Sequence, residues 1–124
     1  MRAGIGYDVH RLTAGRPLVL GGIRVPFDRG LEGHSDADVL VHAIVDAMLG
    51  ALALGDIGQH FPDSDPRWKD ASSLVFLEHA RKLLAERGYR VVNVDAVILA
   101  QRPKLAAFLP QMAEQIARTL YLET

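Results

Sequence analysis

Apolar residues recur at helical spacing in three stretches of the chain. Between residues 39 and 52 they appear every three or four positions and cover most of the circumference, which predicts a helix buried against a sheet. Residues 73–87 carry a narrower apolar face that stops at Gly88. Residues 105–122 form a third helical segment, properly starting near Pro110. We therefore expect three helices, of which the first is the most deeply buried.

Other stretches alternate or are rich in β-branched residues, which is typical of strands. Residues 3–9 alternate small and large side chains, and residues 17–25 form a second extended run, so we expect a hairpin or meander. Residues 90–100 are rich in valine and isoleucine and predict a central strand. The order strand, strand, helix, helix, strand, helix indicates an α+β fold, a two-layer sandwich with helices on one face of a mixed β-sheet.

Residues 55–66 have no periodicity and are rich in glycine, proline and aspartate, which predicts a connecting loop. Loops of this composition most often only turn the chain. A long loop that holds Phe61 and several carboxylates is also typical of a wall around a small ligand. The residues alone leave both interpretations open.

Composition and charge restrict the classes of function. The chain has 124 residues, 49% of them hydrophobic, which is enough for one globular domain with a real core. With 14 basic and 15 acidic residues it has no basic field, so we expect neither a nucleic acid nor a membrane as partner. A secretory hydrophobic region and a membrane-spanning run of about 20 apolar residues are lacking, which predicts a cytoplasmic protein. Because cysteine is absent, any metal must be held by His, Asp or Glu.

A polar stripe marks the start of the first predicted helix. Ser35 and Asp38 have the spacing of a capping box, so the helix should begin there. Asp38, His42 and Asp46 are spaced four residues apart and share one face. A histidine in such an apolar helix is either a core residue held by Asp46 or a metal ligand, because an unsatisfied buried imidazole is costly. Spacing leaves both possibilities open for His42.

A second polar pair lies near the N-terminus. In a strand, Asp8 and His10 point to the same face and can offer two ligands to one cation. Alternatively, the aspartate caps a turn and the histidine lies at the surface. Our hypothesis is that this pair and the cluster around His34 and His42 are two halves of one metal site.

Four sequence blocks occur in an order that goes beyond composition: GIGYDVH (4–10), GHSDADVLVH (33–42), GDIGQHFPDSD (55–65) and AQRPKL (100–105). Together they resemble the signatures of the 2-C-methyl-D-erythritol 2,4-cyclodiphosphate synthase family along essentially the whole chain. The resemblance implies that Asp8, His10 and His42 bind one Zn²⁺ per subunit, with the fourth position left for a substrate phosphate oxygen. It also implies a second divalent cation, Mg²⁺ or Mn²⁺, at the substrate diphosphate.

The resemblance also assigns roles to the other matching residues. His34 and Ser35 match diphosphate contacts, and His34 is the expected catalytic residue. Residues 56–58 match the segment at the ribose, residues 61–65 the wall around the methylerythritol unit, and residues 100–106 the cytidine pocket. The expected substrate contacts are Asp8, Val9, His10, His34, Ser35, Asp56, Ile57, Gly58, Phe61, Pro62, Asp63, Ser64, Asp65, Ala100, Gln101, Arg102, Pro103, Lys104, Leu105 and Ala106.

In that family, the 2-phosphate of a CDP-linked methylerythritol phosphate attacks the β-phosphate, CMP leaves, and a cyclic diphosphate of the non-mevalonate isoprenoid pathway remains. The resemblance implies the same reaction here, in a homotrimer with active sites at subunit interfaces. Residues 1–124 are expected to form a single cyclodiphosphate synthase domain, truncated at the C-terminus so that the last strand of the family is absent. Two alternatives are another His/Asp metal-dependent nucleotide phosphoesterase and an inactive nucleotide-binding module.

Overall fold

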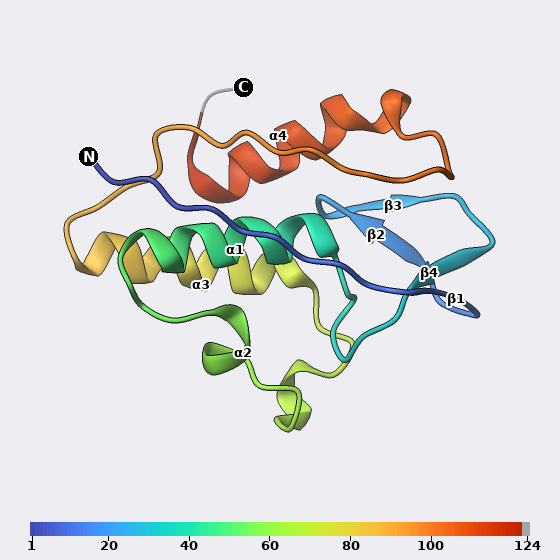
Figure 1. Cartoon of the computed structure of the whole chain (residues 1–124), viewed down its shortest axis with the longest axis horizontal. Helices are drawn as coiled ribbons and strands as arrows, with labels where there is room; N and C mark the ends of the chain where they lie inside the picture. The colour runs from blue at the N-terminus through green and yellow to red at the C-terminus, as the bar shows by residue number, and fades with distance from the viewer. Residues whose placement is uncertain (123–124) are drawn as a thin grey trace.

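The structure is a computed structural model of the chain, and it describes residues 1–122. Glu123 and Thr124, which the sequence analysis places in the same domain, lie outside the described residues. Helices and short strands confirm the expected α+β class (Figure 1). In chain order the elements are β1 (Leu12–Ala14), β2 (Leu18–Leu20), β3 (Ile23–Val25), β4 (Arg29–Leu31), α1 (Val39–Ala51), α2 (Ile57–His60), η1 (Pro66–Trp68), α3 (Ser73–Glu86), η2 (Ala106–Phe108) and α4 (Leu109–Leu120).

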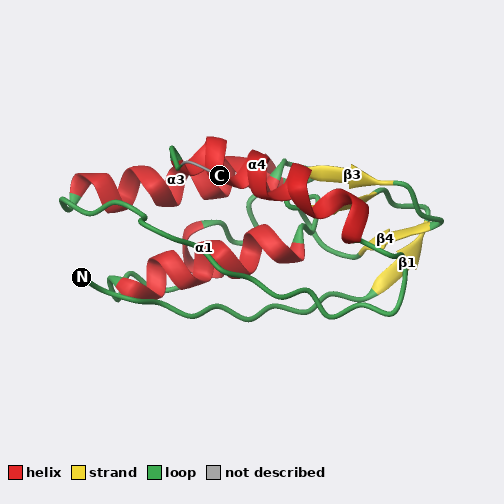
Figure 2. Cartoon of the chain, turned by 90° about the horizontal axis from the view of Figure 1, so that it is seen from above, coloured by secondary structure: helices red, strands yellow, loops and turns green. Residues whose placement is uncertain are grey.

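The core lies between the three long helices. Helix α1 packs along α3, and α4 packs on α3, while the short strands gather at one end of the helices (Figures 1 and 2). Val41 and Val45 of α1 and Leu77 of α3 have no exposed surface. Met112, Ile116 and Leu120 form the buried face of α4, as the sequence predicts. Burial of these apolar faces is the main force that holds the helices together.

The strands form two small antiparallel sheets, β1 with β4 and β2 with β3. The run over residues 17–25, which was expected to be one extended segment, is itself the β2–β3 hairpin. Its turn is Gly21–Gly22, with φ of 59° and 74°, and such left-handed angles at two successive residues favour glycine.

The predicted strands over residues 3–9 and 90–100 are not strands in the described part of the chain. Both segments are extended and run along one side of the helices, as Figure 2 shows. The first lies so close to α1 that a Cβ at Gly4 or Gly6 would overlap carbonyl oxygens of that helix. The extended shape was predicted correctly, but a ladder of hydrogen bonds also needs a neighbouring strand, which a hydrophobic pattern does not supply.

One helix begins later than the sequence predicts, and one short helix was not predicted. Helix α1 begins at Val39 with Asp38 as its N-cap, because the Asp38 carboxylate accepts a hydrogen bond from Val41 N. Ser35 does not take part in a capping box, since its hydroxyl accepts from Ala37 N. The expected loop over residues 55–66 contains the single turn of α2, capped by Asp56. Within residues 1–122, no helix is long and apolar enough to cross a membrane.

Candidate metal centre and its surroundings

Asp8, His10 and His42 meet where the N-terminal extended segment passes the start of α1. One ligand atom from each residue lies within 4.8 Å of the other two, and all three side chains are partly buried. His10 Nε2 is 2.9 Å and His42 Nδ1 is 3.3 Å from the same oxygen, Asp8 Oδ2. Two imidazole nitrogens and one carboxylate oxygen that converge on one point form a donor set suited to a divalent cation. The two predicted halves of the site are therefore brought together.

The chain around His10 is shaped to hold its ring. Asp8 and His10 do project to the same side, although their segment is not a strand. His10 Nδ1 donates to the carbonyl of Glu32 at 2.8 Å, so that Nε2 faces Asp8. Gly33 lies directly against the ring, since a Cβ there would be 3.5 Å from His10 Nδ1 and 2.9 Å from the Ala37 Cβ.

His42 is not a core histidine held by Asp46. Asp46 Oδ1 instead accepts a hydrogen bond from Ile57 N at 2.8 Å and fixes the start of α2. His42 Nε2 is 2.8 Å from Ser73 Oγ on α3 and 3.3 Å from Ser35 Oγ. With Nε2 occupied, His42 presents Nδ1 to Asp8, so the geometry favours the ligand interpretation.

The side chains of Asp8, His10 and His42 interact electrostatically. Burial raises the pKa of Asp8, but hydrogen bonds and charge interactions with His10 and His42 outweigh it and hold that pKa well below its usual range. The hydrogen bond that His10 donates to Asp8 raises the pKa of His10, against the opposing effect of burial. Asp8 is therefore a carboxylate that keeps a positive charge beside it, either a protonated imidazole or a bound cation.

His34 joins the loop before α1 to residues 61–65. Its Nε2 donates to the carbonyl of Asp65 at 2.9 Å, and its own carbonyl accepts from Asp70 N at 2.8 Å. The Asp65 carboxylate does not reach toward the metal group, because it pairs with Arg67 at 2.7 Å, and this pairing lowers the pKa of Asp65. The structure thus places the predicted methylerythritol wall next to the predicted catalytic histidine.

Two predicted substrate contacts also serve the fold. Ser35 is buried, and its hydroxyl binds within the protein. Phe61 is buried too, with its ring centroid 4.3 Å from Phe76 and 5.3 Å from Trp68. Ile57 and Asp65 are partly buried, and the other predicted contacts before residue 100 that lie at the surface are Val9, Asp56, Gly58, Pro62, Asp63 and Ser64.

The predicted cytidine segment, residues 100–106, is not brought to the metal group within one chain. In Figure 1 it lies beyond the β2–β3 hairpin, on the opposite side of the molecule from α2 and the 61–65 loop. Most of its residues are exposed, Lys104 among them. The two parts of the expected site are therefore separate in a single chain.

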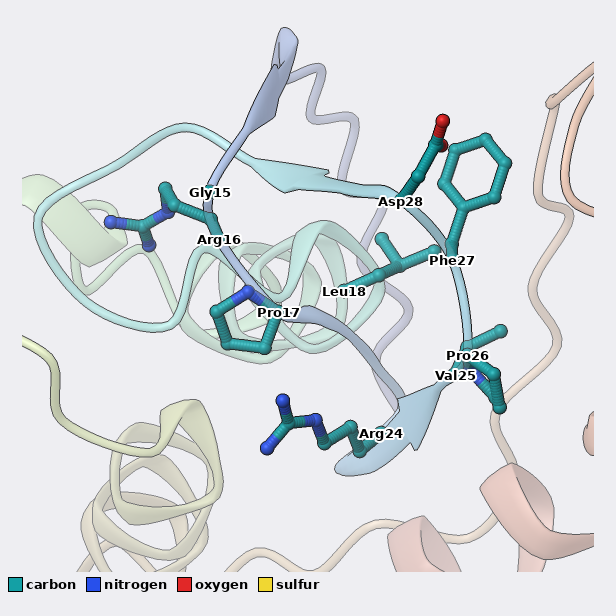
Figure 3. A pocket seen from close by; sticks show the side chains of 9 residues that line it. All are labelled: Gly15, Arg16, Pro17, Leu18, Arg24, Val25, Pro26, Phe27 and Asp28. Atoms are coloured by element: carbon teal, nitrogen blue, oxygen red, sulfur yellow. The ribbon is translucent and has the colours of Figure 1, made fainter.

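Three residues that support the site were missed by sequence reasoning. Ser73 and Asp36 contact each other behind His42, and the sequence predicts a role at the site for neither of them individually. Arg16 donates from Nε to the carbonyl of Leu31 at 2.7 Å and from Nη2 to that of Ser35 at 2.8 Å, which fixes the loop before α1. Figure 3 shows Arg16 among the residues that line a surface pocket of about 330 Å³ beside the hairpin. No pattern along the chain signals these long-range contacts.

Comparisons with known proteins agree with this geometry. The chain is 62% identical over 123 residues to the 2-C-methyl-D-erythritol 2,4-cyclodiphosphate synthase of Solibacter usitatus, covering 99% of this chain and 77% of the relative. It is also 62% identical over 120 residues to the synthase of Desulfitobacterium hafniense, covering 97% and 76%. A solved structure of such a synthase in a CDP-bound form superposes with a TM-score of 0.92 at 43% identity, covering 98% of this chain and 81% of that one.

The fold, the group of residues that could hold a metal ion and these relatives define the class: the chain is an enzyme, a phosphorus–oxygen lyase of the cyclodiphosphate synthase type. The model of the YgbB family matches residues 1–124, and the chain belongs to that family.

Proposed function

We propose that the protein converts 4-diphosphocytidyl-2-C-methyl-D-erythritol 2-phosphate into 2-C-methyl-D-erythritol 2,4-cyclodiphosphate and CMP. An oxygen of the 2-phosphate forms a bond to the β-phosphorus, the bond from that phosphorus to the bridging oxygen breaks, and CMP leaves with the electron pair. The observation that carries the proposal is the convergence of Asp8, His10 and His42 on one point, in a chain so similar to synthases of this name.

The metal-binding group fits this chemistry. We assign Asp8, His10 and His42 as ligands of one Zn²⁺ per chain, and a further Mg²⁺ or Mn²⁺ as a cation that accompanies the substrate diphosphate. A bound zinc ion would act as a Lewis acid toward a phosphate oxygen. Three protein ligands leave a coordination position for that oxygen, as in other catalytic zinc sites.

The chain itself contributes position and charge, which phosphoryl transfer needs more than a protein nucleophile. The hydrogen bond from His34 Nε2 to the Asp65 carbonyl fixes the orientation of the ring. We assign the ring of His34 as a hydrogen-bond donor to a phosphate oxygen, where it would stabilise negative charge that develops in the transition state. Ser35 holds the adjacent loop, and Lys104 contributes a charge at the diphosphate.

A trimer would complete the site. Residues 100–106 lie away from the metal group of their own chain, so we assign them to the cytidine pocket of a neighbouring chain. The two extended segments also expose a row of large apolar side chains, which is typical of a surface covered by another subunit. The row consists of Ile5, Tyr7, Val9, Val97 and Leu99. We propose a homotrimer whose active sites lie between chains.

The product assigns the protein to the non-mevalonate route to isoprenoid precursors, and the cytoplasmic location stays a prediction. The test is incubation of the zinc- and magnesium-loaded protein with the CDP-linked substrate, followed by phosphorus NMR. Resonances of the cyclic diphosphate and of CMP are the expected result, with His42→Ala as the inactive control. A linear phosphate product would instead indicate a phosphoesterase, and binding without turnover would indicate a nucleotide-binding module; either outcome contradicts the proposal.

A further inference from the structure

We propose that Ser73 and Asp36 are a positioning pair that fixes the orientation and tautomer of His42 for the metal. This inference rests on the metal-binding role proposed for Asp8, His10 and His42. Neither Ser73 nor Asp36 contacts the converging ligand atoms directly. They act on the far side of the His42 ring, where α1 and α3 begin beside each other.

The contacts form a continuous chain from the imidazole to a carboxylate. His42 Nε2 lies 2.8 Å from Ser73 Oγ, and the Ser73 hydroxyl donates to Asp36 Oδ1. Asp36 is itself fixed by two backbone donors, Ser73 N at 3.0 Å and Asp38 N at 3.1 Å. Ser73 has no exposed surface, so water cannot replace either of its partners.

The direction of each hydrogen bond follows from the number of protons. A serine hydroxyl has a single proton, and a carboxylate only accepts, so the Ser73 proton points to Asp36. Ser73 Oγ can then only accept from His42, which places a proton on Nε2. A neutral imidazole protonated on Nε2 has its lone pair on Nδ1, the nitrogen that faces Asp8.

Ser35 is the weaker candidate for the same role. Its Oγ is 3.3 Å from His42 Nε2 and already accepts a hydrogen bond from Ala37 N. His10 follows the same logic, because its Nδ1 donates to a backbone carbonyl and its Nε2 faces Asp8. The two histidines therefore present opposite nitrogens to one point, each held by a hydrogen bond on its other side.

The first test measures metal affinity rather than turnover. Ser73→Ala should weaken zinc binding about 10- to 100-fold in competition with a chromophoric chelator, and it should alter the visible spectrum of the Co²⁺-loaded protein. Ser72→Ala is the matched control: it removes the neighbouring hydroxyl, which accepts from Leu74 N at the start of α3 and does not touch His42. The zinc affinity of Ser72→Ala should stay within about twofold of that of the parent, because a hydroxyl that does not contact a metal ligand cannot orient that ligand.

The outcomes separate the two proposals. If the parent protein takes up no zinc, the proposed metal function fails, whatever the variants do. If the parent binds one equivalent and Ser73→Ala binds it equally tightly with an unchanged Co²⁺ spectrum, the positioning pair is wrong and the metal function stands.

A second measurement needs no variant, so it decides the matter even if Ser73→Ala does not fold. Long-range ¹⁵N NMR of the zinc-loaded parent should show His42 protonated at Nε2 and metal-bound at Nδ1, and His10 with the opposite arrangement. The Nε2 proton of His42 should exchange slowly with water, because Ser73 is fully buried. A His42 ring bound to the metal through Nε2 would overturn the inference.

Discussion

The candidate metal site (Asp8, His10 and His42) and the two extended segments (residues 3–9 and 90–100) differ in how far their side chains are satisfied within one chain. Around Asp8, His10 and His42, the two histidine rings and the Asp36 carboxylate each have a hydrogen-bond partner within the same chain. The extended segments place Ile5, Tyr7, Val97 and Leu99 at the surface with no apolar cover from the described residues. A single chain therefore suffices to orient the proposed metal ligands. In the proposed trimer, by contrast, a neighbouring chain covers the apolar row and completes the site with its residues 100–106.

Removal of a ligand should disrupt the metal group most strongly. His42→Ala leaves two of three protein ligands, and we expect the zinc affinity to fall by about a thousandfold, since each ligand carries several kcal/mol of the binding free energy. Metal analysis after dialysis measures this directly. His79→Ala, which removes an exposed histidine of α3, is the control. A full equivalent of zinc retained by His42→Ala would show that the ligand assignment is wrong.

A charge in the apolar row tests the other region. Leu99 is 90% exposed in the single chain, so Leu99→Asp should leave the fold intact but place a carboxylate in the subunit interface. We expect a cost of about 3 kcal/mol per chain, enough to dissociate a trimer at micromolar concentration. Sedimentation velocity would show the change. Val75→Asp, at an exposed site on α3, should not alter the assembly, and an unaffected Leu99→Asp trimer would remove this row from the interface.

The contact between the N-terminal segment and α1 links the two regions. A Cβ on Gly6 would overlap the carbonyl oxygen of Ala43, so Gly6→Ala should lower the free energy of unfolding by about 2 to 3 kcal/mol and displace Asp8. Urea unfolding measures the loss. Gly50→Ala on α1 has open space around it and should instead stabilise the protein by up to about 1 kcal/mol. Equal stability of the two variants would contradict the close packing.

Lys104 tests whether residues 100–106 belong to the substrate site. Lys104→Ala should weaken binding of CDP about tenfold, since it removes one exposed cation proposed to lie near the phosphates, and the zinc content should not change. Isothermal titration calorimetry gives the affinity. Lys82→Ala removes a lysine that pairs with Glu78 on α3, and it should bind CDP as the parent does. The assignment fails if the Lys104 variant also binds CDP with full affinity.

The smallest expected effect concerns the buried carboxyl of Asp38, the N-cap of α1. Burial raises the pKa of Asp38 to about 6, and hydrogen bonds from Gly22 N, Val41 N and Gly21 N limit the rise. The folded state therefore binds a proton more tightly than the unfolded state, and this contribution is present below pH 3.8 and lost as the pH rises through about 6. Relative to Asp38→Asn, the parent should gain about 1 kcal/mol between pH 7 and pH 5. Urea unfolding at both pH values checks this, and a difference independent of pH would contradict it.

Sequence reasoning placed the helices well because their periodicity is local. Met112, Ile116 and Leu120 could be assigned to a buried face from their spacing alone. The sequence of residues 90–100 correctly predicts an extended backbone. It does not predict whether this segment forms a ladder of hydrogen bonds, because that depends on the segments packed beside it. The β2–β3 turn could have been predicted, because the successive glycines Gly21 and Gly22 between two extended runs are a hairpin signal.

The candidate site could be predicted from the sequence only in part. Asp8, His10 and His42 could be proposed as ligands, although the choice between ligand and core residue for His42 came from the family resemblance rather than from spacing. Ser73 lies 31 residues from His42 along the chain, and no periodicity relates the two. Contacts of this kind are set by the packing of α3 against α1, so they become visible only in the folded chain.

The Asp38 carboxylate has a consequence for the way the protein opens. One oxygen accepts from Gly21 N at 3.0 Å and the other from Gly22 N at 2.7 Å, while the first also accepts from Val41 N. The hairpin turn and the first turn of α1 thus donate to the same carboxylate. If either one opens, this shared acceptor becomes exposed to water and the other element is weakened. The hairpin and the helix therefore form one cooperative unit, and the Gly21 and Gly22 amides should exchange their hydrogens only when that whole unit unfolds.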